Sequence, residues 1–155
     1  MKLLVIIFLS IATYTDFKEK KIENILTYPL ILLGLAYNLY QSGISGGMSS
    51  LQGIALAFVI VSILPGFRYG GGDIKLSMGI GAFIGYPLVL RFLFYWAAIS
   101  LVTTCILTIK NKGITYLKNV LITELITLGN IRHDIQSVIG APLMLVAYIV
   151  TLLLN

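Results

Sequence analysis

Six long apolar stretches dominate this chain, and short polar or glycine-rich segments separate them. The stretches run over Leu3–Tyr14, Ile25–Tyr40, Leu51–Leu64, Ile74–Leu90, Phe92–Ile109 and Val138–Leu154. Each is apolar on all sides, so periodicity cannot define a buried face, and length and punctuation must identify the elements. The pattern predicts an all-α polytopic membrane protein with about six spanning helices. We expect one domain over residues 1–155.

The segments between the stretches differ in character. FKEKKIEN is charged, QSGISGGMSS is polar without charge, PGFRYGGG is a glycine-rich turn, and Pro87–Arg91 is expected to be a tight reversal. The long connection Lys110–Gln136 carries leucines at helical spacing, which predicts an amphipathic helix on the membrane surface. Lys118 and Glu124 argue against a seventh spanning helix.

Composition supports a membrane setting. Of the 155 residues, 58% are hydrophobic and only 11% are charged, whereas soluble domains carry about 25% charged residues. Lipid must therefore be part of the solvent. The net charge of +5 is better explained by membrane topology than by nucleic acid, because no groove-like pattern of basic and aromatic residues accompanies it.

The distribution of charge predicts the orientation. With the N-terminus outside, nine of the lysines and arginines fall in inner loops, and only Lys2 and Arg91 fall outside. Because basic residues favour the cytoplasmic side, we expect a multi-pass protein of the inner (cytoplasmic) membrane. A basic cluster follows the first stretch rather than preceding it, so we expect this helix to be retained and not cleaved as a signal peptide. Every acidic residue falls on the inner side, so ionisable chemistry is expected there.

Two aspartates from distant stretches are expected at that inner face. A helix over residues 3–15 rises only about 20 Å, against a hydrocarbon core of about 30 Å. The helix must therefore continue past Asp16, or the bilayer must thin around it. Asp73 opens the fourth stretch from the same side, directly after Gly70, Gly71 and Gly72.

Such a pair can hydrolyse a peptide bond. Two carboxylates that share a site cannot both ionise cheaply, so one keeps a proton. The charged partner can activate a water while the protonated one polarises the scissile carbonyl. Glycines without Cβ atoms would let an extended substrate approach. The alternatives for each aspartate alone are structural: Asp73 could cap a helix, and Asp16 could begin a solvated loop, paired with Lys20.

Three segments resemble the type IV prepilin peptidases, a family of intramembrane aspartyl proteases. GGGDIK (Gly70–Lys75) resembles the GxGD-x-K signature. DFKEKKIEN (Asp16–Asn24) resembles the D-x-x-x-x-R-x-P-N segment, with Lys21 in the arginine place and Glu23 where proline is usual. IGAPLMLVAYIV (Ile139–Val150) is similar to the proline-containing final helix.

The resemblance implies an aspartyl endopeptidase with Asp16 and Asp73 as catalytic dyad and no metal or organic cofactor. It implies prepilin or pseudopilin substrates, cleaved at the cytoplasmic membrane face. Because the paired CxxC domain of larger relatives is not in the sequence, the chain resembles the small stand-alone form of tight-adherence pilus systems, and we expect cleavage without N-methylation. The expected supporting residues are Gly70, Gly71, Gly72, Lys75, Lys21, Asn24, Glu19 and Glu23.

The two glutamates could form an acidic lip that receives basic leader peptides. Two alternatives to the main interpretation stay open. One is a protease of another specificity, such as one for archaellin-type precursors. The other is a non-enzymatic membrane scaffold or a small transporter subunit whose aspartates bind a cation or proton.

Overall fold

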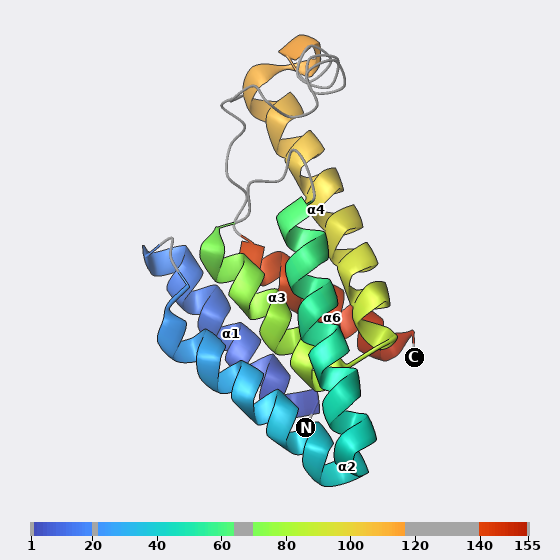
Figure 1. Ribbon diagram of the computed structural model, residues 1–155. Coiled ribbons are helices and arrows are strands. Elements are labelled where there is room, and N and C mark those ends of the chain that lie inside the picture. Colours follow the sequence, from blue (N-terminus) through green and yellow to red (C-terminus); the bar gives the residue numbers. More distant parts are fainter. Residues whose placement is uncertain (1, 20–21, 64–69, 117–139, 155) are drawn as a thin grey trace.

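The computed structural model describes residues 2–19, 22–63, 70–116 and 140–154, and no strand occurs among them. Its helices are α1 (Lys2–Glu19), α2 (Asn24–Ile63), α3 (Gly71–Ile84), α4 (Leu88–Lys112) and α6 (Gly140–Leu153). Figure 1 shows them gathered in one bundle, with the C-terminal part of α4 extending beyond the other helices. The prediction of an all-α protein is confirmed for the described residues.

The helix α2 reverses direction at a single residue. It spans 40 residues, and Gly43 alone departs from helical geometry, with φ 61° and ψ −144°. Glycine adopts such positive φ values without the steric penalty of a Cβ. Figure 1 shows the two arms of α2 meeting at an acute angle. The prediction that all of QSGISGGMSS forms a linker is therefore wrong, because helix continues on both sides of Gly43.

Other boundaries also differ from the expected ones. α1 ends at Glu19, beyond the first apolar stretch, and its continuation past Asp16 agrees with one of the two expected alternatives. The fourth stretch ends early: α3 stops at Ile84, Gly85 takes φ 63°, and α4 already begins at Leu88. The reversal expected at Pro87–Arg91 was therefore predicted too late in the chain. The predicted amphipathic surface helix falls largely on residues 117–139, outside the described residues.

Among the described helices, α2 and α4 are long and apolar enough to cross a membrane, and α6 is apolar but shorter. Because α2 reverses direction, the length of each of its two arms must be compared with the membrane separately. Each arm has about 20 residues and so rises about 30 Å, which matches the hydrocarbon thickness of a bilayer. A total of six spanning helices stays a prediction.

Small residues and one polar side chain join α3 to both arms of α2. A Cβ on Gly53 of the second arm would overlap the backbone of Gly81 in α3. Asn38 of the first arm points its Nδ2 at Ser50 Oγ (2.8 Å) in the second arm and at the carbonyl oxygen of Ala82 (2.8 Å) in α3. Close backbone approach and this shared amide therefore hold three helical segments in register.

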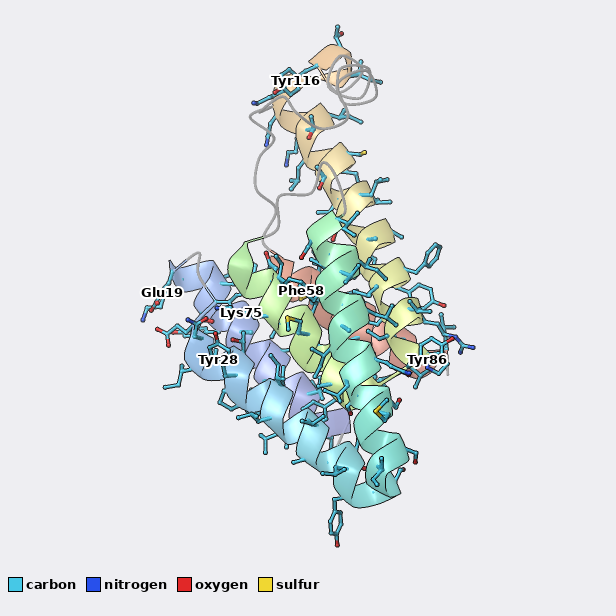
Figure 2. The ribbon with its side chains drawn as sticks, in the orientation of Figure 1. Glu19, Tyr28, Phe58, Lys75, Tyr86 and Tyr116 are labelled. Carbon is cyan, nitrogen blue, oxygen red and sulfur yellow. The ribbon has the colours of Figure 1, made fainter. Side chains whose placement is uncertain are left out.

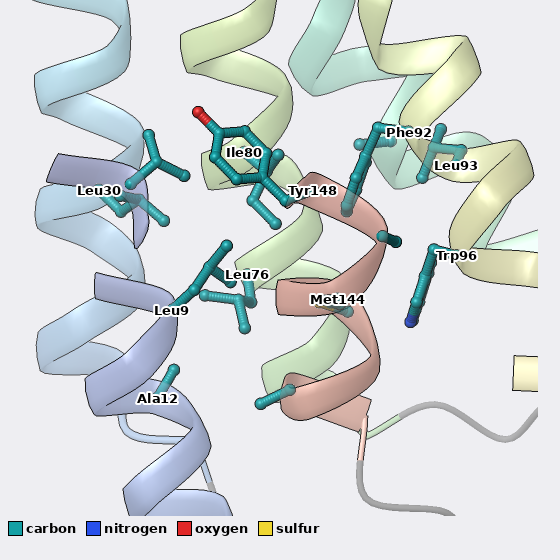
Figure 3. Packing of buried hydrophobic residues seen from close by; sticks show 14 of the residues in the cluster. Leu9, Ala12, Leu30, Leu76, Ile80, Phe92, Leu93, Trp96, Met144 and Tyr148 are labelled. Carbon is teal, nitrogen blue, oxygen red and sulfur yellow. The ribbon is translucent and has the colours of Figure 1, made fainter. Parts of the chain in front are cut away.

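An apolar core fixes α6 against the rest of the bundle. Leu9 of α1, Leu76 of α3 and Trp96 of α4 are all buried around Met144 and Tyr148 of α6, as Figure 3 shows. Between helices in a lipid bilayer, such contacts are stabilised by close van der Waals packing. The core holds α6 so that its first residues lie at the end of α1 and the beginning of α3.

Candidate active site

Asp16 lies in the last turns of α1 and is only 8% exposed. Its Oδ2 accepts a hydrogen bond of 3.1 Å from the backbone amide of Ala141, 125 positions away in the sequence. The first amides of a helix lack intrahelical partners, and the positive end of the helix dipole favours a negative charge there. The N-terminus of α6 therefore provides a backbone donor for a buried carboxylate.

Asp73 is the third residue of α3, and its two carboxyl oxygens have different surroundings. Oδ2 accepts a hydrogen bond of 3.1 Å from the amide of Gly70, the residue that precedes the helix. This contact is one half of a capping box. Oδ1 is buried and has no hydrogen-bond partner among the described residues. A helix-capping role of Asp73 therefore explains the contact of Oδ2 but not the position of Oδ1, which has no partner among the described residues.

Gly140 brings α6 against the second aspartate as well. A Cβ built on Gly140 would overlap the carboxylate of Asp73, and the next residue, Ala141, donates to Asp16. Two consecutive residues of α6 therefore touch both aspartates. No role was predicted for Gly140 or Ala141 from the sequence. The available signal was Pro142, because proline is favoured in the first turn of a helix.

The two carboxylates lie close enough to interact electrostatically. In general, two carboxylates that share a site cannot both be charged cheaply, and one of them can hold a proton. The arrangement offers a base and an acid side by side. It can accept a proton from one reactant and donate a proton to another.

Lys75 points toward α2. Its Nζ donates a hydrogen bond of 2.8 Å to Asn24 Oδ1 and lies 5.2 Å from the centre of the Tyr28 ring. Figure 2 shows Lys75 and Tyr28 near the end of the bundle that carries Glu19. Tyr28 was missed by sequence analysis, although its position four residues after Asn24 places the two on one face of a helix.

The three glycines before Asp73 have different surroundings. Gly72 meets the segment before α2, because a Cβ there would come within 2.8 Å of Ile22 Cβ. A Cβ on Gly71 would have nothing within 4 Å, and Gly70 and Gly71 are both exposed. Gly72 is therefore required by packing, whereas Gly70 and Gly71 add no side chain beside Asp73.

The remaining predicted residues lie around this end of the bundle. Glu19 ends α1 and Glu23 precedes α2, both with exposed side chains. The carbonyl of Glu23 accepts a hydrogen bond from the amide of Leu26 at the start of α2. Lys21 lies outside the described residues. Within the part of the chain that the structure describes, no group of three or more His, Cys, Asp or Glu side chains could hold a metal ion.

Comparison with known proteins gives consistent results. The chain is 38% identical over 80 residues to the preflagellin peptidase of Methanocaldococcus jannaschii. The aligned residues make up 49% of this chain and 34% of that protein. It is 29% identical over 113 residues to the prepilin leader peptidase/N-methyltransferase of Neisseria gonorrhoeae, covering 68% of this chain and 39% of that protein. The chain thus spans little more than a third of the length of these relatives. No solved structure gives a significant match. The type IV leader peptidase family matches residues 3–106, and the chain belongs to this family.

Proposed function

We propose that this protein is a membrane-embedded aspartyl endopeptidase that removes the leader peptide from type IV prepilins and pseudopilins. The observation that carries the proposal is the convergence of Asp16 and Asp73 on the first two residues of α6. Two carboxylates that interact electrostatically, one buried and one partly buried, can serve as an acid–base pair for hydrolysis. Membership of the leader peptidase family supports the same reaction.

In the proposed reaction the charged carboxylate of the pair takes a proton from a water molecule. The water oxygen attacks the scissile carbonyl carbon, and the protonated carboxyl stabilises the negative charge that develops on the carbonyl oxygen. The tetrahedral intermediate then collapses as the amide nitrogen receives a proton from the carboxyl pair and leaves. The roles belong to the pair, so neither Asp16 nor Asp73 is assigned as the base.

The substrate would reach the pair in an extended form past Gly70 and Gly71, which are both exposed among the described residues. A peptide bond inside a helix has its carbonyl shielded and hydrogen-bonded, so the transmembrane helix of the precursor must unwind near this point. The two arms of α2 and the length of α4 support a bundle that spans the inner membrane. In this arrangement the N-terminus lies outside and the aspartates face the cytoplasm.

A second substrate class has a specific observation in its favour. Preflagellin peptidases share 38% and 34% identity with this chain over 80 residues. Archaellin-type precursors are therefore the alternative substrates. Incubation of the protein with a panel of prepilin, pseudopilin and preflagellin precursors separates the two, and preferential cleavage of preflagellin would replace the prepilin assignment.

Co-expression with a prepilin tests the function. We expect the wild type to shift the precursor to the mobility of the mature form, and Asp16→Asn and Asp73→Asn to leave it uncleaved. Full cleavage by either variant would favour a scaffold or a transporter subunit instead. The mass of the mature N-terminus completes the test, because we propose cleavage alone, without the added mass of a methyl group.

A further inference from the structure

Lys75 follows Asp73 by two residues, which suggests at first that its charge acts on the aspartate pair. The direction of its side chain indicates otherwise. Nζ donates to Asn24 Oδ1 at 2.8 Å and lies over the Tyr28 ring at 5.2 Å. Both partners belong to the first two turns of α2, and among the described residues no ion pair joins Lys75 to either aspartate.

A second contact lies on the other side of Asp73. Gly72 has room for only a hydrogen atom against Ile22, which is buried just before α2. The first turn of α3 is therefore held against the start of α2 on both sides of Asp73, by Gly72 packing on Ile22 and by Lys75 bonding to Asn24. We call these two contacts the α2–α3 clasp.

We propose that Lys75 is a positioning residue that acts through Asn24, so that the α2–α3 clasp fixes Asp73 relative to Asp16. The hydrogen bond connects residues 51 positions apart. The segment that it holds follows directly from α1, which carries Asp16. A displacement of about 1 Å at a catalytic group costs about a hundredfold in rate, so a clasp that limits movement of α3 has a direct effect on turnover. This inference rests on the proposed peptidase function.

Paired variants separate positioning from charge. Lys75→Met keeps the length of the side chain but removes its donor and its charge, whereas Lys75→Gln keeps an N–H donor without the charge. Asn24→Leu removes the acceptor and leaves the charge of Lys75 in place, whereas Asn24→Asp keeps an acceptor oxygen. Lys18→Met is the matched control, because it removes an exposed lysine from the last turn of α1.

The measurement is kcat and KM for precursor cleavage per folded enzyme, with purified full-length protein in lipid nanodiscs. Lys75→Met and Asn24→Leu should each lower kcat about tenfold, with KM unchanged. The double variant should be no slower than either single variant, because both changes break one contact. Asn24→Asp and Lys75→Gln should restore most of the lost turnover, and Lys18→Met should match the wild type.

Additive losses, or an unchanged kcat in Asn24→Leu, would overturn the proposal. A slow Lys75→Gln beside a fast Asn24→Leu would assign an electrostatic role to Lys75 instead. The same double-mutant cycle is measured on the thermal unfolding temperature, which requires no substrate. If the wild type cleaves no leader, the proposed function fails, and the coupling in unfolding still tests whether the clasp exists.

Discussion

Gly140 lies against the carboxylate of Asp73 so closely that a Cβ at position 140 would overlap it. The adjacent amide of Ala141 holds Asp16. The spacing of the two aspartates is therefore set by the backbone of a third helix, α6, and not only by α1 and α3. A side chain at position 140 would therefore disturb Asp73.

Gly140→Ala should abolish most of the activity while the protein stays folded. The new methyl group must displace Asp73 or shift the start of α6, and a displacement of about 1 Å lowers turnover about a hundredfold. The control is Gly47→Ala, where the added Cβ meets only the flexible end of Leu39. Cleavage rates and thermal unfolding of both variants check the prediction, and a Gly140→Ala enzyme with wild-type kcat would contradict it.

Asn38 should contribute to stability rather than to turnover. Its amide joins both arms of α2 to the carbonyl oxygens of Ala82 and Phe83. Asn38→Ala leaves the carbonyl of Phe83 without this donor, whereas the carbonyl of Ala82 keeps the hydroxyl of Ser50. Loss of a donor to a partly buried acceptor costs about 1–3 kcal/mol. Thermal unfolding should therefore occur at a lower temperature, whereas kcat of the remaining folded enzyme should be preserved. Ser45→Ala, which removes an exposed local hydrogen bond, should leave the unfolding temperature nearly unchanged.

Glu19 and Glu23 should assist the recognition of basic leader peptides. Both side chains are exposed: Glu19 is the last residue of α1, which carries Asp16, and Glu23 directly precedes α2. The double variant Glu19→Gln/Glu23→Gln should raise KM several-fold for a precursor with a lysine-rich leader, because charges at the rim of an interface attract the partner before contact. The effect should shrink in high salt. A precursor with a neutral leader is the control. Equal KM changes for both precursors would contradict a role of the two glutamates in recognising basic leaders.

Turnover should depend on pH in a bell-shaped manner. At low pH both carboxylates of the pair hold protons and no base is left to activate water. At high pH both are charged and no acid is left to protonate the leaving group. The profile of kcat against pH for the purified enzyme checks this expectation. A rate that only rises with pH up to a plateau would mean that no protonated carboxyl is required.

The sequence was sufficient for the helical class because whole stretches of the chain are too apolar and too long for other elements. Alternation of those stretches also predicted that Asp16 and Asp73 approach from one side. The single-residue reversal at Gly43 was not predictable, because QSGISGGMSS offers several glycines and only tertiary packing selects among them.

The role of α6 was beyond sequence analysis for a similar reason. Ala141 is 125 positions from Asp16, and a hydrogen bond from a backbone amide leaves no trace in side-chain identity. Lys75 was singled out from the sequence as a supporting residue, but its contact with Asn24 and Tyr28 depends on how α2 crosses α3. Contacts of this kind follow from packing and not from local pattern.

The most direct test of the central claim is a comparison of Asp16→Asn, Asp73→Asn and the double variant in purified, folded form. Cleavage of a synthetic prepilin precursor is followed by mass spectrometry. Because the carboxylates act as a unit, each single variant should lose activity to background, and the double variant should be no slower than either. A single variant that keeps more than about a tenth of the wild-type kcat would show that the pair does not perform the hydrolysis.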